Sequence, residues 1–143
     1  MDINGLRAIL VGGASGMARA TAERIVAGGG TVAILDREQS AGAEVASELG
    51  GSWHPCDVLD FEGIELVINE AVEALGGLDA AVNTAGGGKA GRTLTREGPY
   101  SLDDFRAVVD LNLIGTFNTN RLCADHMSRN EANDDGERGV LIN

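Results

Sequence analysis

A glycine-rich turn and the carboxylate that follows it have the spacing most informative for chemistry. The segment Gly12-x-x-x-Gly16-x-Ala18 comes after a short apolar run and before a helical pattern. Glycines let the backbone turn tightly and approach a pyrophosphate, whose charge then faces a helix N-terminus. Asp36 ends the next apolar run, 20 positions after Gly16, as expected for a strand, a helix and a second strand. The pattern predicts a dinucleotide-binding site.

Asp36 also bears on which dinucleotide would bind. A carboxylate at this place accepts hydrogen bonds from the adenosine ribose hydroxyls and repels a 2′-phosphate, so it favours NAD over NADP. Arg37 follows directly, and an arginine there can reach a 2′-phosphate. A purely structural alternative is that Asp36 caps the next helix. We expect NAD as the cofactor, selected by Asp36.

Polar and small residues follow two later strand patterns. Asp57 and Val58 come after the third apolar run, and Asn83, Ala85 and Gly86 come at the end of the fourth. Ligands of open α/β sheets bind at the carboxyl ends of strands, so these residues are expected to join the same site. Asp57 would meet the adenine amino group or act only as a turn residue. Asn83 would face the ligand or satisfy backbone groups at the strand end.

Other reactive residue types give weaker signals. Asn112 is a polar residue within an apolar helical stretch, where asparagine usually bonds to neighbouring backbone. His54 and His126 have no carboxylate or cysteine at ligand spacing, so we expect no metal site. Cys56 lacks a positive neighbour that would lower its thiol pKa, so we do not interpret it as a nucleophile.

Alternating strand and helix patterns must position these residues. Apolar runs predict strands over 7–11, 31–36, 53–57, 80–83 and 140–142, and helical patterns cover 17–27, 39–49, 60–75 and 101–128. Asp60 is the expected N-cap of the third helix, and Ser101 with Asp104 forms a capping-box pattern for the fourth. The alternation predicts an α/β fold with a doubly wound, Rossmann-like parallel sheet in a single domain over 1–143. We expect this domain to be incomplete, because the chain stops as strand five begins.

Composition and charge limit the possible partners. The 143 residues carry a formal net charge of −11, which argues against nucleic-acid or anionic-membrane binding. Two cysteines do not make a disulfide framework, and no N-terminal segment resembles a signal peptide. We expect a cytoplasmic protein with reduced thiols that does not enter membranes.

Together these motifs resemble the short-chain dehydrogenase/reductase family. The residues that carry the likeness are Gly12 to Ala18, Asp36, Asp57-Val58, Asn83-x-Ala85-Gly86 and the segment 110–117. The stretches 101–122 and 138–143 look most like the type-2 3-hydroxyacyl-CoA dehydrogenases. The resemblance implies hydride transfer between NAD and a secondary alcohol or ketone, such as a 3-hydroxyacyl-CoA, a sheet order of 3-2-1-4-5, and a homo-oligomer.

The resemblance also assigns roles to residues. The predicted dinucleotide contacts are Gly12, Ser15, Gly16, Met17, Asp36, Asp57, Val58, Asn83, Ala85 and Gly86. Asn112 is the predicted catalytic residue, since the family uses an asparagine here to hold a water in its proton relay. Ala18 departs from the family's third glycine.

The family's serine and its Tyr-x-x-x-Lys pair are the larger departure. They would lie beyond residue 143, and Tyr100 and Lys89 are in the wrong order to replace the pair. We therefore expect the 143-residue chain to be inactive alone. Two alternatives stay open at this point: a non-catalytic nucleotide-binding or dimerisation module, and a nucleotide-sugar epimerase-like protein.

Overall fold

The computed structural model describes residues 2–143 and contains one five-stranded parallel sheet. Its strands lie in the order β3-β2-β1-β4-β7. Their bounds are β1 Arg7–Val11, β2 Thr31–Asp36, β3 Ser52–Pro55, β4 Ala80–Asn83 and β7 Val140–Ile142. This order confirms the predicted 3-2-1-4-5 arrangement and the doubly wound α/β class.

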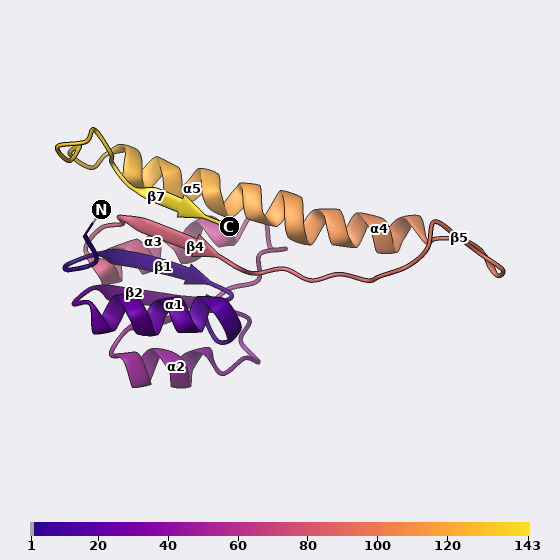
Figure 1. Ribbon diagram of the computed structural model, residues 1–143, viewed down its shortest axis with the longest axis horizontal. Coiled ribbons are helices and arrows are strands. Elements are labelled where there is room, and N and C mark those ends of the chain that lie inside the picture. The colour runs from indigo at the N-terminus through magenta and orange to yellow at the C-terminus, as the bar shows by residue number, and fades with distance from the viewer. Residues whose placement is uncertain (1) are drawn as a thin grey trace.

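Helices cover both faces of the sheet (Figure 1). Helices α1 (Gly16–Ala27) and α2 (Gly42–Leu49) pack on one face, and α3 (Ile64–Leu75) and α5 (Thr116–Ser128) pack on the other. Neighbouring residues of β1 alternate between the two cores: Ile9 and Val11 face α3 and α5, whereas Ala8 and Leu10 face α1 and α2. Because both faces are covered, the central strands β1, β2 and β4 contain continuous apolar runs.

An ion pair joins β1 to the start of β4 at the amino-terminal edge of the sheet. The Arg7 guanidinium donates to both carboxylate oxygens of Asp79, from Nε at 2.8 Å and from Nη2 at 2.7 Å. Arg7 Nη1 also donates to the Gly76 carbonyl at 2.7 Å, which ties in the end of α3. These bonds hold the pKa of Asp79 below its ordinary value, the hydrogen bonds from the Arg7 side chain being the largest cause.

Several predicted element bounds were wrong. The predicted strand 53–57 is displaced to 52–55, and helix α2 begins at Gly42 rather than Gln39. Helix α3 begins at Ile64, and Asp60 is not its N-cap. The Asp60 carboxylate instead accepts from the Gly63 amide at 3.0 Å, which closes a turn before the helix. Local side chain-to-backbone bonds of this kind compete with helix formation.

The predicted helix 101–128 is continuous but not uniform. It consists of α4 (Leu102–Val109), a π-helical turn η1 (Asp110–Gly115) and α5. The hydroxyl of Ser101 accepts from the Asp104 amide at 3.2 Å, which confirms the predicted N-cap. Within η1, Asn112 Nδ2 donates to the Val108 carbonyl at 2.8 Å and so competes with backbone bonding at this turn.

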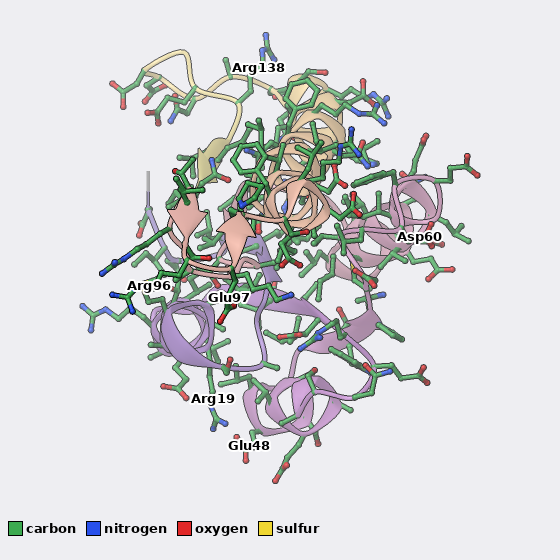
Figure 2. All side chains as sticks on the ribbon, turned by 90° about the vertical axis from the view of Figure 1, so that its right-hand side faces the viewer. Arg19, Glu48, Asp60, Arg96, Glu97 and Arg138 are labelled. Carbon is green, nitrogen blue, oxygen red and sulfur yellow. The ribbon has the colours of Figure 1, made fainter. Side chains whose placement is uncertain are left out.

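The predicted loop 86–99 also contains structure. Two short antiparallel strands, β5 (Leu94–Thr95) and β6 (Gly98–Pro99), form a hairpin. We call residues 86–109 the arm, because in Figure 1 the segment after β4 runs beside α4 to a hairpin far from the sheet. Arg96 and Glu97 form the turn of this hairpin and lie toward the viewer in Figure 2.

Within residues 2–143, every helix is too short or too polar to span a membrane.

Candidate functional site

The glycine-rich turn adopts a backbone that favours glycine at two positions. Gly12 has φ +76° and Gly16 has φ +55°, both in the left-handed region. A Cβ atom added at Gly12 would lie 2.9 Å from the Ala85 amide nitrogen, so β4 and this turn approach each other closely. The Gly12 amide donates to the Leu35 carbonyl at 2.8 Å. Three strands, β1, β2 and β4, therefore fix the turn.

The first turn of α1 leaves hydrogen-bond donors free. Ser15 is the N-cap residue in extended conformation, but within the described chain its side chain makes no capping bond. The first turn also contains no acidic side chain. The first amides of a helix lack intrahelical acceptors, and the helix dipole favours a negative group there. The end of α1 that faces the glycine turn is thus suited to an anion such as a pyrophosphate.

Asp36 ties the end of β2 to the glycine turn. Its Oδ2 accepts from the Ala14 amide at 3.0 Å, and its Oδ1 accepts from the Arg37 amide at 2.8 Å. Each carboxylate oxygen can accept more than one hydrogen bond, so both retain capacity for a ligand hydroxyl. The alternative of Asp36 as an N-cap was wrong, since α2 has Ala41 at that position.

A cavity of about 610 Å³ opens at the carboxyl ends of the strands. It is lined by every predicted dinucleotide contact except Asn83. The residues of this group in the lining are Gly12, Ser15, Gly16, Met17, Asp36, Asp57, Val58, Ala85 and Gly86. Sequence positions far apart thus meet in one hollow of a size typical for a small-molecule ligand.

Asp57 and Asn83 bond mainly to nearby backbone. Asp57 Oδ1 accepts from the Leu59 amide at 2.9 Å, as in the turn that was the alternative reading of this residue. Asn83 is buried, and its Oδ1 accepts from the Ala85 amide at 3.1 Å. Within residues 2–143 its Nδ2 has no hydrogen-bond partner. Asn83 therefore supports the loop that lines the cavity, and its amide retains a free donor.

Asn112 holds the root of the arm against the helix. Its Oδ1 accepts from the Gly87 amide at 3.1 Å, and its Nδ2 donates to the Gly87 carbonyl at 2.7 Å. Asn112 does not line the cavity, but Leu111 does. The side chain thus fixes the loop after β4 that includes Gly86. Its predicted role of holding a water stays a prediction.

Sequence reasoning missed several residues of the site. Leu59, Thr84 and Leu111 also line the cavity. Thr84 could have been predicted from the sequence, because it lies between two predicted contacts, Asn83 and Ala85. Gly115 could not have been predicted in this way. A Cβ atom at Gly115 would lie 3.1 Å from the Val58 carbonyl oxygen, so this glycine lets η1 approach the cavity wall. Such a contact between distant segments has no local pattern.

The thiols of the molecule are kept in their neutral form. Cys56 and Cys123 are free and buried in the core beneath α3 and α5. Burial is the main cause that raises the pKa of each thiol to about 12. Cys56 lines the cavity, but a protonated thiol is a poor nucleophile. Residues 2–143 also contain no group of three His, Cys, Asp or Glu side chains arranged to hold a metal ion.

Comparison with known proteins identifies the class to which this fold and cavity belong. The family model described as short chain dehydrogenase matches residues 7–143. The chain belongs to the short-chain dehydrogenase family, as its motifs suggested. It is 43% identical over 146 residues to 3-hydroxyacyl-CoA dehydrogenase type-2 of Bos taurus, covering 99% of this chain and 56% of the relative. The chain thus spans about half the length of the curated relatives it matches.

Solved structures show the same similarity. The crystal structure of 3-hydroxyacyl-CoA dehydrogenase type-2 from Mycobacterium avium has a TM-score of 0.87 and 37% identity, covering 96% of this chain and 55% of that one. A 7α-hydroxysteroid dehydrogenase in complex with NADH has a TM-score of 0.79 and 28% identity, covering 98% and 52%. The NADPH-dependent 3-quinuclidinone reductase of Rhodotorula rubra has a TM-score of 0.75 and 29% identity, covering 89% and 49%. Neighbours with either nicotinamide cofactor therefore share this fold.

Proposed function

We propose that residues 1–143 form the NAD-binding part of an oxidoreductase that transfers hydride between NAD and a secondary alcohol. The observation that carries the proposal is the bond between the Asp36 carboxylate and the Ala14 amide of the glycine turn. The bond puts a carboxylate beside an end of α1 that is suited to an anion, within one cavity, which supports the proposal. This combination is suited to a ligand with a pyrophosphate next to an unmodified ribose.

Each part of the cavity would meet one part of the dinucleotide. Gly12, Ser15, Gly16 and Met17 would hold the pyrophosphate at α1, and Asp36 would accept the adenosine ribose hydroxyls. Asp57 and Val58 would contact the adenine, and Ala85 and Gly86 the nicotinamide ribose, with Asn83 and Asn112 fixing their loop. When bound, the nicotinamide would supply hydride chemistry to the substrate carbon.

NAD preference follows from charge. A 2′-phosphate at the Asp36 carboxylate would bring two anions together in a site where Arg37 is the one basic residue of the lining. A ribose hydroxyl instead donates to Asp36 and gains a charge-assisted bond of about 1.5–3 kcal/mol.

Isothermal titration calorimetry tests the cofactor proposal. We expect the unmodified chain to bind NAD more tightly than NADP, and Asp36→Ala to reduce that preference by about tenfold or more. Glu38→Ala is the matched control, because it also removes one negative charge. Glu38 lies two positions after Asp36, and its side chain is exposed and outside the cavity. Equal affinity for NAD and NADP in the unmodified chain would contradict the role given to Asp36.

We propose a 3-hydroxyacyl-CoA or a related secondary alcohol as the substrate, supported by the similarity to the type-2 enzymes.

The 143-residue chain is expected to bind NAD without turnover. Its one tyrosine, Tyr100, donates its hydroxyl to the Lys89 carbonyl at 2.6 Å in the arm and does not line the cavity. Absorbance of reduced nicotinamide in the presence of a 3-hydroxyacyl-CoA measures this. Turnover by a pure sample would mean that another group supplies the acid–base chemistry.

We also propose that a second copy of the chain covers the outer face of the long helix. Leu113, Ile114 and Phe117 are exposed there, next to one another along η1 and α5. A contiguous exposed apolar surface of this kind favours protein association. Light scattering after gel filtration should show an oligomer whose mass falls in a Phe117→Asp variant. A monomer at all concentrations would contradict this proposal.

A further inference from the structure

Sulfur atoms of this chain differ sharply in their access to solvent. Met17 is 76% exposed, whereas Met127 is 5% exposed and both cysteines are buried. An exposed thioether is open to oxidants, but a buried one is shielded by its neighbours. Among the sulfur-bearing side chains that the structure describes, Met17 is therefore the one that a dissolved oxidant can reach.

The position of Met17 connects this exposure to the cavity. Met17 belongs to the first turn of α1, directly after Gly16, and it lines the cavity with Ser15 and Asp36. Its backbone carbonyl accepts from the Thr21 hydroxyl at 2.8 Å, which anchors the backbone and leaves the side chain to project. The thioether thus lies at the entrance to the cavity, beside amides that lack a side-chain cap.

We propose that Met17 is a site of reversible oxidation by peroxides, and that its sulfoxide weakens dinucleotide binding. The inference rests on the function proposed above. In the reaction, the sulfur lone pair attacks one oxygen of hydrogen peroxide and the O–O bond breaks. A new S–O bond forms, and the other oxygen leaves as hydroxide, which takes the proton of the transferred oxygen and becomes water. Sulfur loses two electrons and the peroxide gains them.

The sulfoxide would act on the site in two ways. It replaces an apolar side chain with a polar one whose oxygen is a hydrogen-bond acceptor. Placed at the start of α1, this oxygen can accept from the same free amides that would hold a pyrophosphate. Its partial negative charge also lies close to that anion. Both effects oppose binding of the dinucleotide without requiring a change of fold.

The other sulfur atoms are poor competitors for the oxidant. The thiolate is the form that reacts with peroxide, and burial raises the pKa of Cys56 and of Cys123 to about 12. Met127 packs in the core cluster beneath α3 and α5. Mild peroxide should therefore modify Met17 well before these residues.

Peptide mass spectrometry and calorimetry on the full 143-residue chain test the inference together. After mild hydrogen peroxide, we expect the peptide with Met17 to gain one oxygen while the peptide with Met127 does not. The dissociation constant for NAD should rise about tenfold, the loss expected for one charge-assisted hydrogen bond. Methionine sulfoxide reductase should restore it. Far-UV circular dichroism should stay unchanged throughout.

A Met17→Leu variant is the matched control, because leucine is apolar and cannot form a sulfoxide. Each chain is compared only with itself before and after peroxide, and the affinity of Met17→Leu should not change on treatment. An unchanged NAD affinity in fully Met17-oxidised native chain would overturn the inference and leave the proposed function intact. Oxidation of Met127 at the same rate would also overturn it. Failure of the untreated chain to bind NAD would overturn both proposals.

Discussion

The sheet and the arm are stabilised by different kinds of interaction. Within the strands β1, β2 and β4, nearly every side chain is buried in one of two apolar cores. The residues of α4, by contrast, are all half-buried or exposed. The arm is held by polar contacts instead: Tyr100 to the Lys89 carbonyl, Lys89 to Asp104 at 2.6 Å, and Asn112 to Gly87.

This difference suggests that the sheet and the arm contribute to different properties: the sheet to folding stability, and the arm to association. Burial of apolar side chains supplies most of the free energy of folding, whereas exposed ion pairs contribute little. The sheet with its covering helices should therefore determine whether the chain folds. The arm, which presents Leu94, Leu102 and Phe105 to solvent, should instead contribute to what the folded chain associates with, as should the exposed apolar side chains of η1 and α5.

A core truncation should give the largest effect on stability. Leu10 is fully buried at the centre of β1, so Leu10→Ala should lower the free energy of unfolding by about 2–5 kcal/mol. Leu66→Ala makes the same change at a side chain that is 63% exposed on α3 and should cost about 0.5 kcal/mol or less. Urea unfolding followed by Trp53 fluorescence measures both. Equal losses would show that burial does not distinguish the two sites.

Breaking the ion pair at the amino-terminal edge should give a smaller loss. Asp79→Asn should lower the free energy of unfolding by about 1–2 kcal/mol at neutral pH, because the bidentate bond to Arg7 is lost. The folded pKa of Asp79 lies below its unfolded value, so this stabilisation is complete above about pH 4 and is lost as the pH falls. Denaturation at several pH values should show that the free energy of unfolding falls less steeply with acid in Asp79→Asn than in the unmodified chain. Asp103→Asn, at an exposed pair on the arm, serves as the control.

His54 should add a weaker pH dependence of the free energy of unfolding near neutral pH. It is half-buried on β3, and burial lowers its pKa, with the nearby Glu70 opposing the shift. The unfolded chain therefore binds the proton more readily, so stability is complete above about pH 6.5 and falls as the pH drops through the folded pKa. His54→Gln should flatten this part of the pH profile of stability. An unchanged slope in His54→Gln would mean that other groups cause it.

A change on the arm should have the smallest effect on stability. Phe105 is 57% exposed on α4, so Phe105→Ser should change the free energy of unfolding by about 0.5 kcal/mol or less. The same variant should associate less in light scattering, because it removes an exposed apolar ring. A loss of stability as large as that of Leu10→Ala would show that the arm is packed as firmly as the sheet.

Sequence patterns predicted the sheet better than the arm, and the reason is physical. The central strands β1, β2 and β4 are buried on both faces and contain uninterrupted apolar runs that can be recognised locally. The start of α3 was predicted too early, because Asp60 is an equally good cap for a turn. The hairpin at Leu94 and Pro99 was missed, since its short, exposed strands lack an apolar pattern.

Most residues that line the cavity were predicted, because they follow the ends of strands in the sequence. The residues that were not predicted are defined by contacts between distant segments. Asp36 and Gly12 belong to a short local pattern whose spacing reflects one strand–helix–strand unit. The approach of Gly115 to Val58 joins two segments far apart in the sequence, so no spacing rule finds it. Asn83 does not line the cavity, because the alternation of β4 turns its side chain toward the α3 and α5 face, and its predicted contact with the ligand stays a prediction.

The π-helical turn at Asp110–Gly115 has a consequence for the direction in which the arm points. A π-helical turn holds about one residue more than an α-helical turn, and each residue of a helix advances its faces by about 100°. The turn therefore takes up one additional residue within the same rotation, so the side chains of α4 keep the side that they would have on an α-helix one residue shorter. We expect deletion of a single residue within 110–115 to leave an ordinary α-helical turn, with Leu102 and Phe105 on the same side of the molecule and the sheet intact.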